Sequence, residues 1–274
     1  MKKLLITALA ALALTACATS HRQAEYSGAK GIGYAEAVRM GDVAVKKIRY
    51  PVAEQETLYF SDTGEPVAQA ADGKFMRKVL GKTKDGLMVV QDFYADGKKQ
   101  SNAFILAKDE EIGNFIATRA HSGVVNSYLP DGKLAESIVY QNGKLVQKNI
   151  YRNGRLFAMK SKQNNGYVVI LSENGDKRLE MLEADTETPT VRYFYANGQL
   201  GAEWGQDEKT VTQYAKMWDE YGNSLDKDAP VDKKMLLLIG LMGVIHELEE
   251  IGDQYKGLVM VPDIEDSKQS IGAE

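Results

Sequence analysis

Residues 128–156 read YLPDGKLAESIVYQNGKLVQKNIYRNGRL and contain one short pattern three times. Each copy has a tyrosine, one or two further residues, Asp-Gly or Asn-Gly, a basic residue and a leucine, and successive glycines are 11 residues apart. Asn-Gly and Asp-Gly supply the positive φ angles that tight hairpin turns require. The roughly five to eight residues left between turns match the usual length of a strand. The pattern therefore predicts consecutive β-hairpins.

The same pattern continues on both sides of this segment. Clear copies occupy residues 94–98 and 195–200, and weaker copies occupy 60–64, 71–75, 84–87, 173–175 and 220–223. Segments between the turns, such as 137–140 and 191–195, are rich in β-branched and aromatic residues, which favours strands. We therefore predict an all-β fold over residues 31–228. It is an antiparallel meander of β-hairpin repeats in an elongated, solenoid-like sheet, clearest over residues 94–225.

These Tyr-x-x-Asn-Gly-Lys-Leu units resemble the MORN-2 repeats of the YwqK-type antitoxin family, which are also found in many bacterial lipoproteins. The resemblance covers residues 60–225, is best over 128–156, and is degenerate around 108–125 and 180–190. It implies a sheet built of β-hairpin repeats. It also implies an antitoxin or immunity role, in which the protein neutralises a toxin by binding it directly.

The first 16 residues have the features of a lipoprotein signal peptide. A cationic start, Met-Lys-Lys, precedes the apolar run LLITALAALAL at residues 4–14, which is too short to span a bilayer. The run leads into Leu14, Thr15, Ala16 and Cys17, a sequence that resembles a bacterial lipobox, and Cys17 is the single cysteine of the chain. We expect cleavage before Cys17 and attachment of a diacylglyceryl group, whose acyl chains include palmitate, to its thiol. The alternative is an ordinary signal peptide in which the cysteine stands by chance.

The residues after the cysteine predict a tether and a location. Residues 17–30 are small and polar, which is typical of a flexible linker. Residue 18 is alanine, whereas aspartate at this position retains lipoproteins at the inner membrane in enteric-type bacteria. In a Gram-negative host we therefore expect the outer membrane, facing the periplasm or the cell surface. A Gram-positive host would place the same anchor on its single membrane.

The segment GIGYAEAVRMGDVAVKKIRYP at residues 31–51 contains two closely spaced glycines near its start. A phosphate-binding glycine loop would need a preceding strand and a following helix within a βαβ unit. The hairpin pattern around the segment does not provide that context. We therefore predict a loop that leads into a strand.

The repeats also suggest a candidate binding surface. Its aromatic part would be an exposed strip for a glycan or peptide, made by Tyr128, Tyr140, Tyr151 and Tyr195. Alternatively, these rings are cross-strand partners that hold the sheet together. Its basic part, Lys133, Lys144 and Arg155, occupies matching positions of three successive units and would project from one edge of the sheet. Alternatively, these are ordinary solvated charges beside turns.

Residues 229–260 predict a C-terminal helix. Met235 to Ile245 are eleven consecutive apolar residues, after which the pattern becomes amphipathic, and Asp232 stands where a helix cap is expected after Pro230. The apolar run is too short for a membrane span. We expect the helix to cover the open face or end of the sheet, or alternatively to bind a partner or a membrane surface. Residues 261–274 form a polar tail that we expect to be frayed.

Composition argues against several classes of function. The 34 basic and 38 acidic residues give a net charge of −4. This charge does not favour nucleic-acid binding, which needs clustered Lys and Arg residues to bind the phosphates. One cysteine and three histidines are little material for a metal site, and His246 and Glu250 alone do not match the metalloprotease motif. His121 and Ser122 are adjacent in sequence and lack a nucleophile elbow. We therefore expect no catalytic residues, no metal and no cofactor.

Together these features predict a non-enzymatic, lipid-anchored protein of the bacterial cell envelope. It would act as a binding or scaffold module that presents its sheet to an envelope protein or a glycan. The alternative is the antitoxin or immunity role that the repeat resemblance implies.

Overall fold

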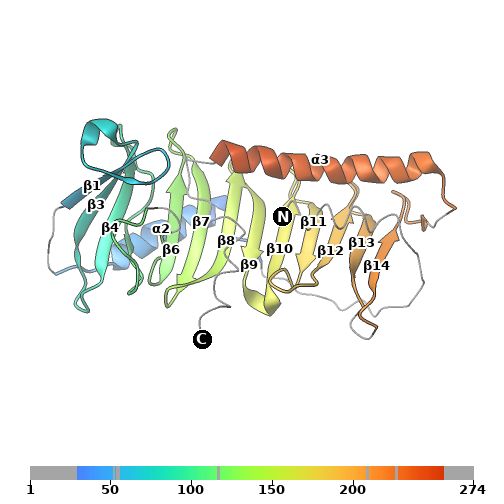
Figure 1. Cartoon of the computed structure of the whole chain (residues 1–274), viewed down its shortest axis with the longest axis horizontal. Coiled ribbons are helices and arrows are strands. Elements are labelled where there is room, and N and C mark those ends of the chain that lie inside the picture. Colours follow the sequence, from blue (N-terminus) through green and yellow to red (C-terminus); the bar gives the residue numbers. More distant parts are fainter. Residues whose placement is uncertain are drawn as a thin grey trace. The chain divides into compact units, whose positions relative to one another are not determined.

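The computed structural model describes residues 30–51, 53, 56–115, 118–207, 210–225 and 228–255 (Figure 1). Its fourteen strands form two antiparallel sheets, one of five strands and one of nine. A long helix follows the last strand. The predicted all-β meander with a C-terminal helix is thus confirmed. The described chain divides into two compact units, Gly31–Leu156 and Phe157–Ile251.

The first unit contains helix α2, the five-stranded sheet and the first three strands of the larger sheet. The five-stranded sheet has the order β2-β1-β3-β4-β5, and β6, β7 and β8 follow one another as antiparallel neighbours. The elements are α2 (Tyr34–Lys47), β1 (Glu56–Phe60), β2 (Pro66–Val67), β3 (Phe75–Lys82), β4 (Met88–Tyr94), β5 (Phe104–Ile105), β6 (Gly123–Tyr128), β7 (Leu134–Gln141) and β8 (Lys144–Arg152). A short 3₁₀ turn, Ala70–Asp72, precedes β3.

Helix α2 corrects the prediction of a loop and strand over residues 31–51. The helix packs on β6, where Ala37 is fully buried and its carbonyl accepts a hydrogen bond from Asn126 Nδ2 at 2.8 Å. Gly41, one turn later, lies so close to Asn126 that a Cβ at this position would overlap the amide. The glycine therefore serves close packing of helix against strand, which its sequence neighbourhood did not indicate.

The break between the two sheets coincides with the degenerate part of the repeats. Arg77 in β3 is fully buried and binds Asp92 of β4 through two hydrogen bonds of 2.7 and 2.9 Å. Its remaining donors reach the carbonyls of Ile112 and Asn114 at 3.1 and 2.8 Å. A charged side chain thereby holds the loop between β5 and β6, the segment in which the repeat pattern is degenerate.

The turns of the meander are of two kinds. Asn142-Gly143 and Asn153-Gly154 have positive φ at both residues, 52° and 76° in the first turn and 52° and 73° in the second, as type I′ hairpins require. In the turn at Asp131-Gly132, positive φ is confined to the glycine (83°). Here the Leu129 amide donates to the Lys133 carbonyl at 2.8 Å, and the register shifts at Tyr128. The Asp-Gly copy thus forms a longer, bulged turn.

The second unit contains six consecutive antiparallel strands and helix α3. The strands are β9 (Arg155–Ser161), β10 (Tyr167–Leu171), β11 (Lys177–Leu182), β12 (Thr190–Phe194), β13 (Leu200–Gln206) and β14 (Gln213–Met217), with a 3₁₀ turn, Gln163–Asn165, before β10. Each strand pairs with the next one in sequence.

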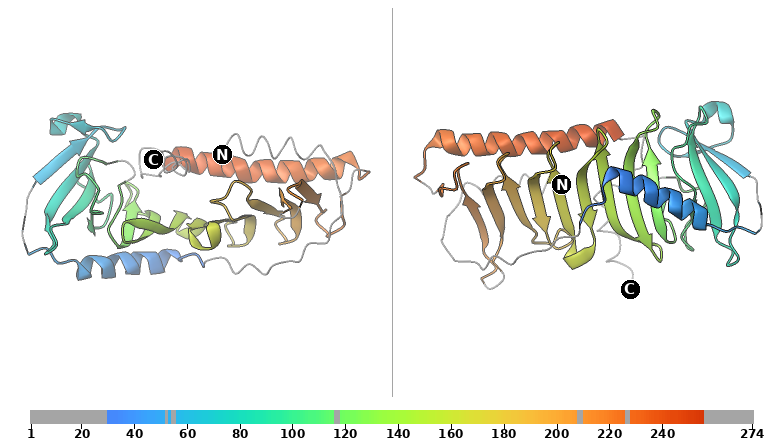
Figure 2. Two further views of the ribbon diagram at one scale, coloured as in Figure 1. Left: turned by 60° about the horizontal axis from the view of Figure 1, so that its bottom comes forward. Right: turned by 180° about the vertical axis from the view of Figure 1, so that it is seen from behind.

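Helix α3 (Val231–Tyr255) runs across the strands of the second unit (Figure 1, Figure 2). Leu237, Leu241 and Val244 are buried, as predicted for a helix that covers the sheet. Lys233 donates to Asp219 at 3.0 Å and ties the start of the helix to the turn after β14. Asp232 lies inside the first turn of the helix, where its charge is favourable to the helix dipole. In the described part of the chain, no helix is long and apolar enough to cross a membrane.

Candidate functional site

The four tyrosines of the predicted aromatic surface have different surroundings. Tyr140 and Tyr151 are 6% and 1% exposed and belong to the core of the first unit. Tyr140 packs with Phe104 and Ile138, and the ring of Tyr151 meets Tyr34 edge-on with 5.6 Å between centroids. Burial raises the pKa of both hydroxyls. These two rings therefore cannot contribute to an exposed strip, and their position agrees with the packing alternative.

Tyr128 and Tyr195 are half-buried and also take part in internal contacts. Tyr128 packs against the core cluster beneath α2, and burial raises the pKa of its hydroxyl. The Tyr195 hydroxyl donates to the carbonyl of Trp218 at 2.9 Å, and burial raises its pKa to about 12. Trp218 directly precedes the next turn at the same end of the strands. Tyr195 thus links two turns of the meander.

The basic residues do not form a ladder along one edge. In an antiparallel meander, consecutive turns alternate between the two ends of the strands. Lys133 follows the β6–β7 turn and Arg155 follows the β8–β9 turn at the same end, whereas Lys144 follows the β7–β8 turn at the opposite end. Lys133 also pairs with Asp131 of its own turn at 2.7 Å. The prediction of one basic edge is wrong because an 11-residue period reverses the chain direction at every copy.

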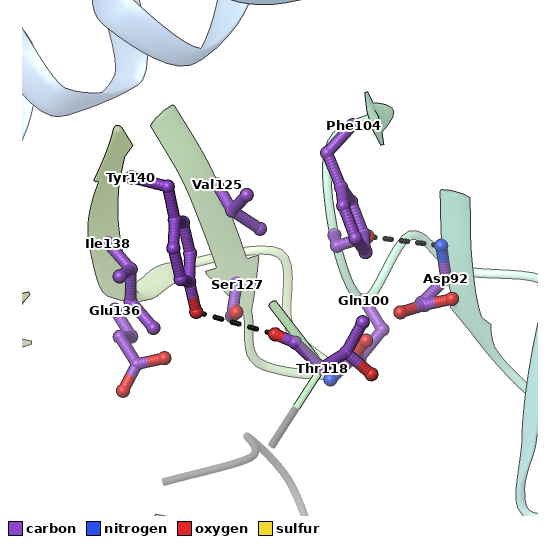
Figure 3. Close-up of a pocket in the computed structure, with 10 residues that line it drawn as sticks. Asp92, Gln100, Phe104, Thr118, Val125, Ser127, Glu136, Ile138 and Tyr140 are labelled. Atoms are coloured by element: carbon purple, nitrogen blue, oxygen red, sulfur yellow. Dashed lines mark hydrogen bonds between the residues drawn. The ribbon is translucent and has the colours of Figure 1, made fainter. Parts of the chain in front are cut away.

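A buried charged pair and a small cavity lie in the first unit. Figure 3 shows the carboxylate of Glu136 beside the cavity, with the Tyr140 hydroxyl donating to the Thr118 carbonyl at 3.3 Å. Lys148 Nζ lies 2.5 Å from Glu136 Oε2, and both residues are buried. Burial raises the pKa of Glu136, and the nearby Lys148 ammonium opposes that rise.

The volume of this cavity limits what it can hold. It measures about 30 Å³, which is room for about two water molecules, whereas pockets for organic ligands are roughly tenfold larger. A second hollow, of about 290 Å³, is open and polar. It is lined by Glu183, Thr188, Thr190, Gln206, Asp207 and Val211. The Glu136 cavity can therefore hold water, but not an organic substrate.

A row of charged side chains crosses the sheet of the second unit and was not predicted. Arg192 of β12 donates to Glu203 of β13 at 2.8 Å and lies 3.5 Å from Glu180 of β11. Lys177 adds a contact of 2.6 Å to Glu180. The hydroxyls of Tyr167 and Tyr214 donate to the two ends of the row, to Glu180 at 2.8 Å and to Glu203 at 3.3 Å.

The electrostatics of this row favour the charged form of Glu180. Burial raises the pKa of Glu180, but the hydrogen bonds from Lys177 and Tyr167 and the charge of Arg192 outweigh burial, so its pKa is lowered overall. Glu180, Arg192 and Glu203 are separated by 12 and 11 residues, which places them side by side on neighbouring strands. The same period that revealed the turns could therefore have revealed the row.

The remaining sequence candidates do not assemble into a reactive site. His246 lies 3.5 Å from Glu250 on the exposed surface of α3. Ser122 donates its hydroxyl proton to the carbonyl of His121. Among the described residues, no group of three His, Cys, Asp or Glu side chains could hold a metal ion. Leu14, Thr15, Ala16 and Cys17 lie outside the described residues.

Comparison with known proteins assigns neither a family nor a function to the chain. No protein-family model matches the chain, and a search of curated proteins finds no relative.

Proposed function

We propose that this chain is a lipid-anchored protein of the bacterial cell envelope that binds a protein partner through its surface and has no enzymatic activity. One observation carries the proposal. The single cysteine of the chain follows an apolar run of eleven residues, which ends at Leu14, and then Thr15 and Ala16; this is where a lipoprotein needs the thiol that carries its diacylglyceryl group. Each buried methylene of an acyl chain contributes about 0.8 kcal/mol, so two or three chains make a durable anchor.

The anchor and the tether would hold the folded units near a membrane. Lys30, the first described residue, is the thirteenth residue after Cys17, so thirteen residue steps join the two. Fully extended, they reach about 45 Å, and as a flexible chain they average roughly 20 Å. A partner in the same membrane, or just above it, is therefore within reach.

The two hollows among the described residues support binding through the surface. The cavity of about 30 Å³ does not admit an organic ligand. The hollow of about 290 Å³ is open and polar, whereas ligand pockets are mostly apolar, so recognition would use exposed turns, strand faces and helices. Such surfaces suit a macromolecule, because many weak contacts over a large area are needed for stable binding.

Replacement of the lipobox thiol tests the anchor. Cys17→Ser should abolish labelling of the protein by radioactive palmitate and release it from membranes washed with carbonate. The matched control combines Cys17→Ser with Ser20→Cys, which restores a thiol three residues away from the lipobox. This control should also remain unlabelled, because lipidation depends on the position of the thiol. Continued labelling or firm membrane binding of Cys17→Ser would refute the anchor.

Crosslinking in cells tests the partner. The acylated full chain should be crosslinked in its native host and the captured proteins identified by mass spectrometry, with Cys17→Ser as the control for capture at the membrane. One dominant envelope protein supports the proposal. A toxin as the dominant partner would instead favour the immunity role that the repeats imply. Failure to capture any protein would contradict a protein partner and direct the search to glycans.

A further inference from the structure

Five Asn-Gly pairs of the chain lie between consecutive strands of the larger sheet. They occupy residues 142–143, 153–154, 165–166, 174–175 and 197–198. Glycine has no Cβ to crowd its own nitrogen, so an asparagine that is followed by glycine is especially prone to lose its side-chain amide. Whether such a pair reacts in a folded chain depends on what holds the glycine nitrogen in place.

The loss of the amide begins at the glycine nitrogen. This nitrogen bonds to the side-chain carbonyl carbon of the asparagine, the bond from that carbon to Nδ2 breaks, and Nδ2 leaves as ammonia with the proton of the glycine amide. A five-membered succinimide ring remains. Water, the only other reactant, then opens the ring at one of its two carbonyl carbons. The product is either aspartate or isoaspartate, and isoaspartate makes the backbone one methylene longer.

Hydrogen bonds hold four of the five glycine amides. The carbonyls that accept them are those of His121 from Gly143 at 2.7 Å, Gln163 from Gly166 at 3.0 Å, Ser172 from Gly175 at 2.9 Å and Tyr195 from Gly198 at 2.9 Å. The amide of Gly154 is exposed and donates to no residue in the described part of the chain. A bonded amide must break its hydrogen bond before it can turn toward the asparagine side chain. These bonds therefore slow the reaction at four pairs, but not at residues 153–154.

The two type I′ turns provide a matched comparison. The φ angles of Asn142 and Asn153 are both 52°, and those of the following glycines are 76° and 73°, so the φ angles do not distinguish the turns. In the first turn the Asn142 amide also donates to Ser122 Oγ at 3.0 Å. Gly143 is buried, and a Cβ there would lie 3.5 Å from Ala107. At the glycine of the second turn a Cβ would meet no atom within 4 Å, so only the second turn can move freely.

We propose that Asn153 is a site of spontaneous deamidation, and that it reacts faster than the other four Asn-Gly pairs of the folded chain. Both products add one negative charge between Arg152 and Arg155. Isoaspartate also lengthens the backbone of the turn between β8 and β9, and a two-residue hairpin turn depends on the dihedral angles of just two residues. The hairpin that carries isoaspartate therefore loses its type I′ geometry. The proposal does not depend on the lipid anchor.

Peptide mapping by mass spectrometry tests the selectivity. The acylated full chain in detergent should be aged at mildly alkaline pH, which promotes loss of the amide proton, and then digested at acidic pH to stop the reaction. In the folded chain Asn153 should react about fivefold faster than Asn142, the factor by which one backbone hydrogen bond lowers the population of the reactive amide. In chain unfolded by urea this ratio should fall, because the bond to His121 is lost. An equal ratio in both states, or another Asn-Gly pair that reacts first in the folded chain, would overturn the proposal.

Variants of the two type I′ turns identify the product. Isoaspartyl methyltransferase adds a radioactive methyl group to isoaspartate and so measures the product of ring opening. Type I′ turns accept Gly-Gly, so Asn153→Gly and Asn142→Gly should keep their hairpins. Asn153→Gly should lose most of the label that the parent gains on ageing, whereas Asn142→Gly should keep it. Equal labelling of Asn153→Gly and the parent would contradict the proposal. So would deamidation of Asn153 to aspartate without isoaspartate, since no succinimide would then have formed.

Discussion

At the scale of single residues, the tyrosine of the repeat pattern has a role beyond packing its ring. Tyr94 and Tyr195 each stand at the start of a turn and donate their hydroxyl hydrogen to the backbone carbonyl just before a later turn. The acceptors are Tyr128, at 2.6 Å, and Trp218, at 2.9 Å. A tyrosine at this place in the repeat therefore ties distant turns together, which phenylalanine could not do.

Tyr195→Phe removes the hydroxyl and keeps the ring, so it measures the contribution of the hydroxyl bond alone. The ring keeps its edge-on contact with Tyr193 at 5.5 Å, but the bond to Trp218 is lost. We expect the free energy of unfolding to fall by about 1 kcal/mol, measured by urea denaturation. Tyr50→Phe, at an exposed tyrosine, is the control and should change little. Equal stability of Tyr195→Phe and the parent would show that the hydroxyl bond contributes nothing.

Glu136 predicts a pH dependence of stability. Burial raises the pKa of Glu136 above its ordinary value of 4.5, so the folded chain holds this proton more tightly than the unfolded chain does. The stability that this proton provides is therefore present at acidic pH and is lost as pH rises through the raised pKa.

The Gln side chain in Glu136→Gln cannot titrate, so this variant should not lose stability in this way as pH rises. Raising the pH from about 4 to about 8 should lower the free energy of unfolding of the parent more than that of the variant. Glu187→Gln, at an exposed site, should follow the parent. Parallel pH profiles of the parent and Glu136→Gln, recorded by thermal unfolding, would contradict the proposed effect of burial.

At the scale of elements, helix α3 depends on a glycine for its packing. A Cβ at Gly240 would overlap the Tyr193 hydroxyl of β12, and at Gly201 of β13 it would contact Leu237 of the helix at 3.0 Å. Glycine costs about 1 kcal/mol in helix propensity, so its place in the middle of α3 reflects a close approach to the sheet.

Gly240→Ala should therefore destabilise the second unit although alanine is the better helix former. Overpacking costs about 1–3 kcal/mol and exceeds the gain in propensity. Adding Tyr193→Phe removes the oxygen that the new methyl group meets, so the double variant should recover most of the loss relative to Tyr193→Phe alone. Urea denaturation of the parent, Gly240→Ala, Tyr193→Phe and the double variant completes a double-mutant cycle. A lack of rescue would indicate that the Tyr193 hydroxyl is not the limiting contact.

At the scale of the whole molecule, the proposed anchor determines which partners the chain can meet. In a Gram-negative host, Ala18→Asp should shift the protein from the outer to the inner membrane, because aspartate after the acylated cysteine acts as a retention signal. Separation of the two membranes on a sucrose gradient measures the shift. Ala18→Ser is the matched control and should stay with the parent. An unchanged distribution of Ala18→Asp would contradict lipoprotein sorting of this chain.

The hairpins and the C-terminal helix could be predicted from the sequence because both are set by local interactions. Asn142-Gly143 needs only its own backbone preferences to form a tight turn, and the 11-residue period extends that turn into a meander. Helix α3, from Val231 to Tyr255, lies within the predicted segment 229–260. Its apolar run is continuous, so no knowledge of the partner surface was needed to expect a helix.

The tertiary structure alone decided which side of each element is covered. Helix α2 packs on β6 where Gly41 lets it approach Asn126, a residue 85 positions away. Tyr140 and Tyr151 are buried because other elements pack over their side of the strands. Exposure of Ile239 on α3 is likewise a property of the assembled unit. A periodic sequence specifies the turns and the alternation of faces, but the contacts between distant segments determine which face meets solvent.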